Sequence, residues 1–133
     1  MNILSIGSKI TLRKISEEIA EKVERINFLD TTTNNFLNWG LSKTKKINYY
    51  SGDITKIDTL INAGLNDSDI IIVHSENDME SLFIAQKSKI NANSSIFVIL
   101  EDLSLAEIFE SLGFIIFDSH NLKITRLLNK LGN

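Results

Sequence analysis

The chain has 133 residues, 43% hydrophobic and 23% charged, a composition ordinary for a globular protein that is long enough to bury a core. Its net charge of −3 offers no basic surface for nucleic acid, and the absence of cysteine excludes disulfides, thiol catalysis and thiolate metal sites. No apolar run approaches the roughly 20 residues that span a bilayer, and no secretory signal is expected before the first strand, so we expect a cytoplasmic protein.

Strand and helix patterns alternate along the first half of the chain. Short apolar runs predict strands, and apolar residues at helical spacing with charged residues opposite predict helices between them. Thr31–Thr33 and Thr55 are expected to cap two of these helices, and Gly40 and Gly64 to follow their ends. The predicted strands lie at residues 2–6, 26–30 and 47–51, and the helices around 15–23, 36–41 and 57–61.

The second half repeats this alternation. Residues 69–73, DIIIV, form the strongest strand pattern, and such an uninterrupted branched run is typical of a parallel strand covered on both faces. Asn77 or Asp78 is expected to cap the helix that follows. Further strands are predicted at 95–100 and 114–117, and helices around 82–86, 105–112 and 122–131.

Six strand–helix pairs with short connections predict one α/β domain over residues 1–133. Right-handed crossovers make it a Rossmann-like, doubly wound parallel sheet with strand order 3-2-1-4-5-6 and helices on both faces. In such a sheet ligands bind beyond the carboxyl ends of the strands, where strand order reverses. The candidate binding residues at those ends are Gly7, Ser8, Lys9, Asp30, Thr31, Gly52, Asp53, His74 and Ser75.

The turn after the first strand keeps one glycine of a dinucleotide-binding motif. Gly7 occupies the first position of G-x-G-x-x-G, but the second and third positions are Lys9 and Leu12. We expect Leu12 either to hold the first helix away from the sheet or to fill the pocket. Two interpretations stay open: a reshaped phosphate site made by Lys9 and the backbone of residues 8–12, or an ordinary loop that has lost its ligand.

Three further side chains are candidates beside this turn. Asp30 follows Gly7 at about the 20-residue spacing of a ribose-binding acid, which favours that role over a helix cap for residues 31–35. Asp53 is expected to bind an adenine amino group or to cap its own turn. His74 lies near any bound ligand, but neither it nor His120 has partners spaced as a triad or metal site, so we predict no catalytic or metal-binding residue.

Several segments along the chain share a pattern with a known family: Ile6-Gly7 with the following amphipathic helix, Asp30, residues 52–55 (GDIT), residues 63–70 (AGLNDSDI) and residues 105–113 (LAEIFESLG). Together they resemble the TrkA-N family, the regulatory nucleotide-binding (RCK or KTN) domains of potassium channels and transporters. The resemblance covers the whole chain and implies that Gly7, Asp30 and Asp53 fall on the phosphate-loop, ribose and adenine positions. The chain departs from the family at Lys9 and Leu12, and again after the 69–73 strand. There His74, Ser75–Asp78 and Glu80 replace a threonine, an Asp-rich turn and an asparagine.

The resemblance implies a non-catalytic regulatory domain whose ligand state changes the geometry of a homodimer and thereby gates a membrane potassium channel or transporter. Three possibilities remain open for its ligand: NAD(H), another adenine nucleotide, or no ligand at all. The alternatives are a ligandless interaction module and an NAD-dependent oxidoreductase, for which His74 is the one evident acid or base. The apolar stripe of the last helix, Leu122 to Leu131, is expected either to support self-association or to pack in the core. The chain is expected to be a stand-alone domain or a fragment of a longer one.

Overall fold

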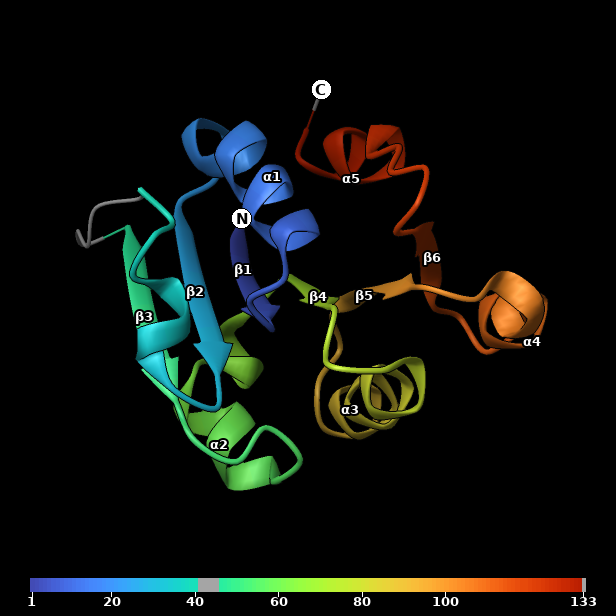
Figure 1. Cartoon of the computed structure of the whole chain (residues 1–133), viewed down its shortest axis with the longest axis horizontal. Coiled ribbons are helices and arrows are strands. Elements are labelled where there is room, and N and C mark those ends of the chain that lie inside the picture. The colour runs from blue at the N-terminus through green and yellow to red at the C-terminus, as the bar shows by residue number, and fades with distance from the viewer. Residues whose placement is uncertain (41–45, 133) are drawn as a thin grey trace.

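The computed structural model describes residues 1–40 and 46–132 (Figure 1). Its centre is a six-stranded, all-parallel sheet in the order β3-β2-β1-β4-β5-β6, which confirms the predicted fold class and strand order. Each strand lies within two residues of its predicted position. The strands are β1 (Asn2–Ile6), β2 (Arg25–Asp30), β3 (Ile47–Ser51), β4 (Ile70–Val73), β5 (Ser95–Leu100) and β6 (Ile115–Asp118).

Helices cover both faces of the sheet. Helices α1 and α5 lie on one face, α2 and α3 on the other, and α4 lies beside the β6 edge (Figure 1). Short 3-10 turns lie at Ala20–Lys22, Thr33–Phe36, Leu65–Asp67 and Leu103–Leu105. The α-helices are α1 (Ile10–Ile19), α2 (Ile57–Asn62), α3 (Asp78–Asn91), α4 (Ala106–Ser111) and α5 (Thr125–Lys130).

The helix predicted around residues 36–41 is wrong in its described part, where the chain forms only the 3-10 turn Thr33–Phe36. Thr32 caps this turn, because its side chain accepts a hydrogen bond from the Asn34 amide at 3.2 Å. Phe36 and Trp39 are three residues apart, a spacing that puts both rings against Phe28 in a tight turn. Leu41 lies outside the described residues.

Two other helix ends differ from the predictions. The residue that precedes α2 is Lys56, not Thr55, because the Thr55 hydroxyl is bonded to Asp53 instead. At α3 the prediction is confirmed, because Asn77, one of the two residues expected to cap it, accepts the Glu80 amide at 2.9 Å. The last helix is also shorter than predicted, since α5 begins at Thr125 rather than Leu122.

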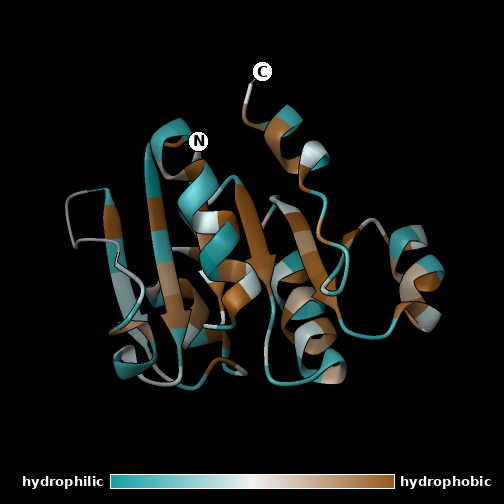
Figure 2. Ribbon diagram, turned by 45° about the horizontal axis from the view of Figure 1, so that its top comes forward, coloured by the Kyte–Doolittle hydropathy of each residue, from teal (hydrophilic) through white to brown (hydrophobic). Residues whose placement is uncertain are grey.

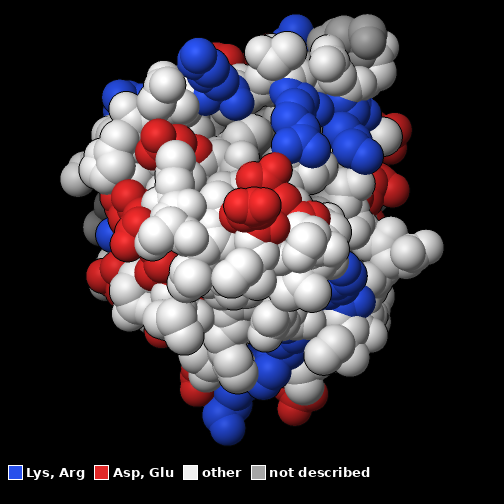
Figure 3. All heavy atoms as spheres, turned by 90° about the vertical axis from the view of Figure 1, so that its right-hand side faces the viewer, with Lys and Arg blue, Asp and Glu red and all other residues white. Residues whose placement is uncertain are grey.

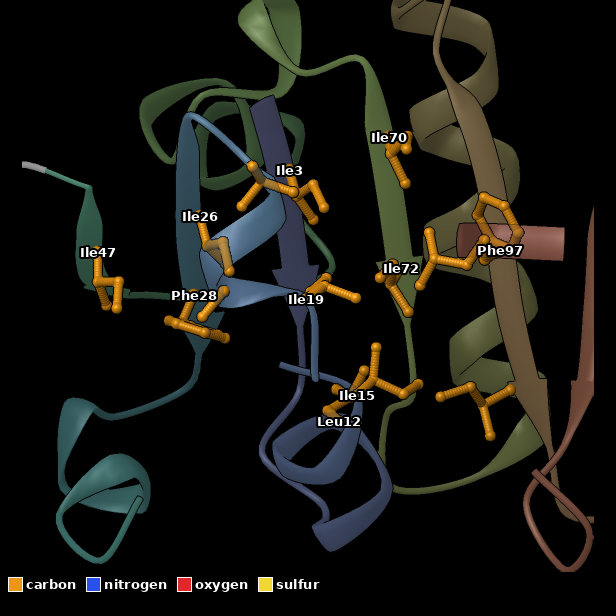
Figure 4. Close-up of a cluster of buried hydrophobic side chains, with 14 of the residues drawn as sticks. Ile3, Leu12, Ile15, Ile19, Ile26, Phe28, Ile47, Ile70, Ile72 and Phe97 are labelled. Atoms are coloured by element: carbon orange, nitrogen blue, oxygen red, sulfur yellow. The ribbon is translucent and has the colours of Figure 1, made fainter. Parts of the chain in front are cut away.

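The sheet separates two apolar layers. Every residue of β4 is at most 1% exposed, as expected for a strand covered on both faces, and Figure 2 shows β4 as one continuous hydrophobic strand. One layer, between the sheet and α1 and α5, includes Ile3, Leu12, Ile15, Phe28, Ile72, Phe97 and Leu127, most of which are drawn in Figure 4. The other, beneath α2, α3 and α4, includes Leu4, Ile6, Leu60, Ile71, Leu82, Ile84 and Val98.

The apolar stripe of the last helix packs on its own sheet. Leu127 is fully buried, and Leu122, Leu128 and Leu131 are partly buried against the same core. Of the two expectations for this stripe, core packing therefore accounts for it, and it needs no second molecule to cover it.

Apolar side chains remain exposed elsewhere, on α3 and α4. Figure 3 shows the α4 end of the molecule, where much of the surface is uncharged around a central group of acidic side chains, with basic side chains near its upper rim. Within residues 1–40 and 46–132, no helix is both long and apolar enough to cross a membrane. On these two helices the exposed apolar side chains are Met79, Phe83 and Ile90 of α3 and Ile108 of α4, with Leu105 and Leu112 at the ends of α4.

Candidate functional site

Gly7 lies where the carboxyl ends of β1 and β4 meet. Its amide donates to the Leu29 carbonyl at 2.8 Å, and its φ is +113°. A Cβ at this position would lie 2.0 Å from the carbonyl oxygen of His74, so backbone approaches backbone here as only glycine permits. The surviving glycine of the motif is thus required by the contact between the two strands, whether or not a phosphate binds.

The N-terminus of α1 is open. Lys9 is the residue before the helix and makes no side-chain cap, and the first turn of α1 contains no acidic residue. Uncapped N–H groups and the helix dipole favour an anion at such an end. The Lys9 ammonium adds positive charge beside it, although its Nζ lies 3.4 Å from the Glu76 carbonyl oxygen, across the gap between the β1–α1 and β4–α3 turns.

Leu12 belongs to the core. It is fully buried, and it points toward the sheet beside Ile15 under α1 (Figure 4). One of its methyl carbons lies 3.2 Å from the position that a Cβ on Gly7 would take. The side chain therefore fills the contact between helix and sheet that the third glycine of a dinucleotide motif would leave narrow.

Asp30, at the end of β2, is only 7% exposed and is held from three directions. Its Oδ1 accepts the Thr31 amide at 2.8 Å, while its Oδ2 accepts the Ser8 hydroxyl and the Asn35 amide nitrogen, the latter at 3.0 Å. It does not cap the following turn, which Thr32 caps. Asp30 instead ties the β1–α1 turn to the end of β2, and a ribose would have to replace some of these donors.

Asp53, after β3, is exposed and turned toward its own loop. Its Oδ1 accepts the Thr55 hydroxyl at 2.6 Å and the Thr55 amide at 3.0 Å, and these bonds lower the pKa of the Asp53 carboxyl. The turn-capping role is therefore filled. Neighbouring Gly52 joins the loop to the site, because its amide donates to the Asp30 carbonyl at 3.2 Å.

His74, at the end of β4, is the centre of a hydrogen-bonded chain. Its Nδ1 contacts the Thr11 hydroxyl on α1, and its Nε2 lies 2.9 Å from Oε1 of Glu101. Oε2 of Glu101 accepts the Ser119 hydroxyl at 2.6 Å and lies 3.4 Å from His120. The ends of β4, β5 and β6 are thereby linked to one another and to α1.

His74 is 2% exposed, and its burial lowers its pKa, opposed by the hydrogen bond to Glu101. The neutral ring then accepts from Thr11 at Nδ1 and donates to Glu101 at Nε2. Bonds from Ser119 and His74 lower the pKa of Glu101. Sequence reasoning missed Glu101, although it directly follows the 95–100 strand and so had to lie at the same edge as His74.

Ser75 points away from the β1–α1 turn. Its amide donates to the Ser81 hydroxyl at 2.8 Å, and its own hydroxyl donates to Glu80, so both groups bond to α3. Asp78 in the first turn of α3 accepts the backbone amides of Glu101 and Asp102, each at 2.9 Å. In the described part of the chain, no group of three or more histidine and acidic side chains is placed to hold a metal ion.

Apart from Asp53, which bonds within its own loop, the predicted residues fall into two groups. Ser8, Lys9, Asp30 and exposed Thr31 surround the open end of α1, with Gly52 bonded to Asp30. His74 and Ser75 belong to a second group, in which the His74 side chain bonds to Thr11 and Glu101 and the Ser75 side chain bonds to Glu80 in α3. Gly7 lies between the two groups and contacts both.

A parallel sheet in this order, with an open helix N-terminus where strand order reverses, defines a Rossmann-like domain. The TrkA-N domain model matches residues 6–118, and the chain therefore belongs to the TrkA-N domain family. A search of the curated proteins finds no match to the sequence.

Solved structures share the fold at low sequence identity. The GsuK channel bound to NAD superposes with a TM-score of 0.71 and 13% identity, over 97% of this chain and 22% of that one. The Kef CTD of Shewanella denitrificans in its AMP-bound form gives 0.67 and 16%, over 100% and 83%. The TrkA-N domain of the Escherichia coli inner membrane protein ybaL gives 0.74 and 14%, over 99% and 96%. The chain thus spans less than a quarter of the GsuK chain.

Proposed function

We propose that this chain is a non-catalytic regulatory domain of a potassium transport system and that it binds an adenine nucleotide. The observation that carries the proposal is membership of the TrkA-N family, combined with an uncapped α1 N-terminus beside a buried carboxylate, Asp30. The likeness to the NAD-bound GsuK channel and the AMP-bound Kef domain supports the same ligand class.

In this proposal the nucleotide phosphate lies at the start of α1, where the free N–H groups and the Lys9 ammonium favour an anion. The ribose hydroxyls donate to Asp30, in place of the Asn35 amide and the Ser8 hydroxyl. Asp53 and Gly52 border the adenine. Asp30 links the β1–α1 turn to β2 through its hydrogen bond from Ser8. A ribose that replaces this hydrogen bond would remove the link and free the start of α1 to move.

His74 bonds to the Thr11 hydroxyl at one ring nitrogen and to Glu101 at the other, an order of groups that also occurs in catalytic triads. The imidazole is only 2% exposed, however, so a substrate does not reach it without displacing these side chains. For this reason we propose regulation rather than turnover by an NAD-dependent oxidoreductase.

The proposed partners are a membrane potassium channel or transporter and a second copy of this chain in a homodimer, with the domain on the cytoplasmic side. The exposed apolar side chains of α3 and α4 are the surface that such a dimer would bury, since α5 is occupied by the core. Sedimentation of wild type and Ile90→Glu, a change at a side chain 83% exposed, tests this: a dimer that the variant loses supports the surface.

A ligandless interaction module is the second candidate. It is favoured by two observations: Gly7 is explained by its contact with His74, and Asp30 already accepts three hydrogen bonds from its own chain. In that case the fold persists as a scaffold for protein contacts alone.

Thermal unfolding with AMP, ADP, ATP, NAD and NADH separates the two candidates, because a ligand that binds only the folded state raises its midpoint. The proposal predicts that at least one nucleotide raises the unfolding midpoint. This rise should be smaller in Asp30→Ala and in Lys9→Ala, and Lys9→Ala is expected to disturb the fold less because Lys9 is partly exposed. Each variant is compared with its own ligand-free midpoint. Unchanged curves with every nucleotide would favour the ligandless module.

A further inference from the structure

The carboxyl edge of the sheet has two halves of different character. In a doubly wound sheet of this order a dinucleotide lies across both halves, one nucleotide over each. The first half here, at the ends of β1, β2 and β3, has the open helix end and Lys9. The second half, at the ends of β4, β5 and β6, carries side chains that bond to one another.

Hydrogen bonds close the second half from side to side. Glu101 joins His74 of β4 at 2.9 Å to Ser119, just beyond β6, at 2.6 Å. His74 continues the chain to Thr11 on α1, so the links reach the helix that borders the first half. A second nucleoside lying over β4 and β5 would have to break bonds to a carboxylate, which are stronger than bonds between neutral groups.

Three carboxylates lie at the second half, where Asp78 accepts the backbone amides of Glu101 and Asp102. Lys9 lies at the border, with its Nζ 3.4 Å from the Glu76 carbonyl oxygen. The positive end of α1 and Lys9 favour phosphate at the first half, and both a monophosphate and a dinucleotide would use that position. The two ligands are therefore distinguished by the hydrogen-bonded side chains of the second half and not by charge.

We propose that Glu101 and His74 are specificity-determining residues that close the second half of the crevice, so that the site takes a nucleoside monophosphate in preference to a dinucleotide. This inference rests on the proposed function, because it concerns the same site and narrows its ligand class. The first half supplies one phosphate position and one ribose position, and a monophosphate needs no more.

Calorimetric titration of the folded chain with AMP and with NAD tests the proposal. The wild type is expected to bind AMP at least about tenfold more tightly than NAD. Glu101→Ala removes the link and one carboxylate at a side chain that is 40% exposed, so the fold is expected to survive. This variant should narrow the AMP-to-NAD ratio several-fold, chiefly by improving NAD binding. Glu107→Ala, the same change of charge at an exposed position of α4, is the matched control and should leave the ratio unchanged.

His74→Ala is the second test variant, once circular dichroism shows that it is folded. It too is expected to narrow the AMP-to-NAD affinity ratio. Equal or tighter binding of NAD by the wild type would overturn the proposal while leaving the proposed function standing. So would a folded Glu101→Ala that keeps the wild-type ratio. A wild type that binds neither AMP nor NAD would overturn this inference, and one that binds none of AMP, ADP, ATP, NAD and NADH would remove the proposed function as well.

Discussion

The backbone of Gly7 and the carbonyl of His74 lie so close that a Cβ on residue 7 would be 2.0 Å from the His74 oxygen. This contact joins the β1–α1 turn to the end of β4, at the point where strand order reverses. It also holds together the two halves of the candidate site.

Gly7→Ala is expected to destabilise the protein by about 3 kcal/mol or more, because it adds a backbone clash to the cost of a positive φ. Chemical denaturation measures the loss. Gly40→Ala is the matched control, since φ there is +69° and nothing lies within 4 Å of its Cβ position. The control isolates the conformational cost, about 1 kcal/mol. Equal losses in the two variants would contradict the role of the contact.

Leu12→Ala is expected to cost about 3 kcal/mol, as for other fully buried leucines. The control is Ile10→Ala in the same helix, at a side chain 57% exposed, which should change the unfolding free energy little. Restoring a dinucleotide motif by Leu12→Gly would therefore be confounded by unfolding. A small loss of unfolding free energy in Leu12→Ala would contradict the core position of this side chain.

Lys9→Gly alone is the cleaner test of whether Lys9 limits the affinity for NAD.

Asp30→Ala is expected to cost about 2–3 kcal/mol, because it leaves the Ser8, Thr31 and Asn35 donors without their acceptor at a nearly buried position. The free energy of unfolding without nucleotide measures this cost. Asp53→Ala, at an exposed loop, should lose clearly less. A neutral Asp30→Ala would mean that Asp30 is held for a ligand rather than for the fold.

His74 predicts a pH dependence of stability. Its folded-state pKa is lowered by burial from the usual 6.5, so below that pH the unfolded chain binds more protons than the folded one. Stability is therefore full above about pH 6.5 and falls as the pH falls toward the folded pKa. Glu101 raises the pKa of His74, as does Asp78, while Lys9 lowers it.

The lowered pKa of Glu101 acts in a separate range, below its usual 4.5. Stability that depends on its ionised form is present above that value and is lost as the pH falls further. The change of the denaturation midpoint between pH 8 and 5 therefore reports on His74. In His74→Gln the midpoint should depend less on pH over this range. A wild type whose midpoint does not change over this range would refute the assignment.

The fold was predictable because its signals are local. Branched apolar runs such as 69–73 mark buried parallel strands, and short connections leave few topologies. The 36–41 helix prediction failed because Phe36 and Trp39 pack against Phe28, on the strand β2 that precedes the turn. This packing against the sheet overrode the local helical pattern.

The candidate site was predictable in position but not in its bonds. Gly7, Asp30 and Asp53 stand at strand ends, where the sequence placed them. Their partners depend on which side chain points across from a neighbouring element, as Asn35 does toward Asp30. The pairing of His74 with Glu101 required the order of β4 and β5, together with the side-chain directions, before it could be seen.

The central position of β1 has a consequence for folding kinetics. β1 pairs with β2 on one side and β4 on the other, and the second pairing brings together segments as distant as Asn2 and Asp69, 67 residues apart. The sequence contains no proline, so refolding lacks the slow phases of prolyl isomerisation, and closure of this long loop is expected to limit its rate. The contact between Gly7 and His74 forms only at that step, so a nucleotide bound at the ends of these strands can stabilise the folded product but cannot assist the first steps of folding.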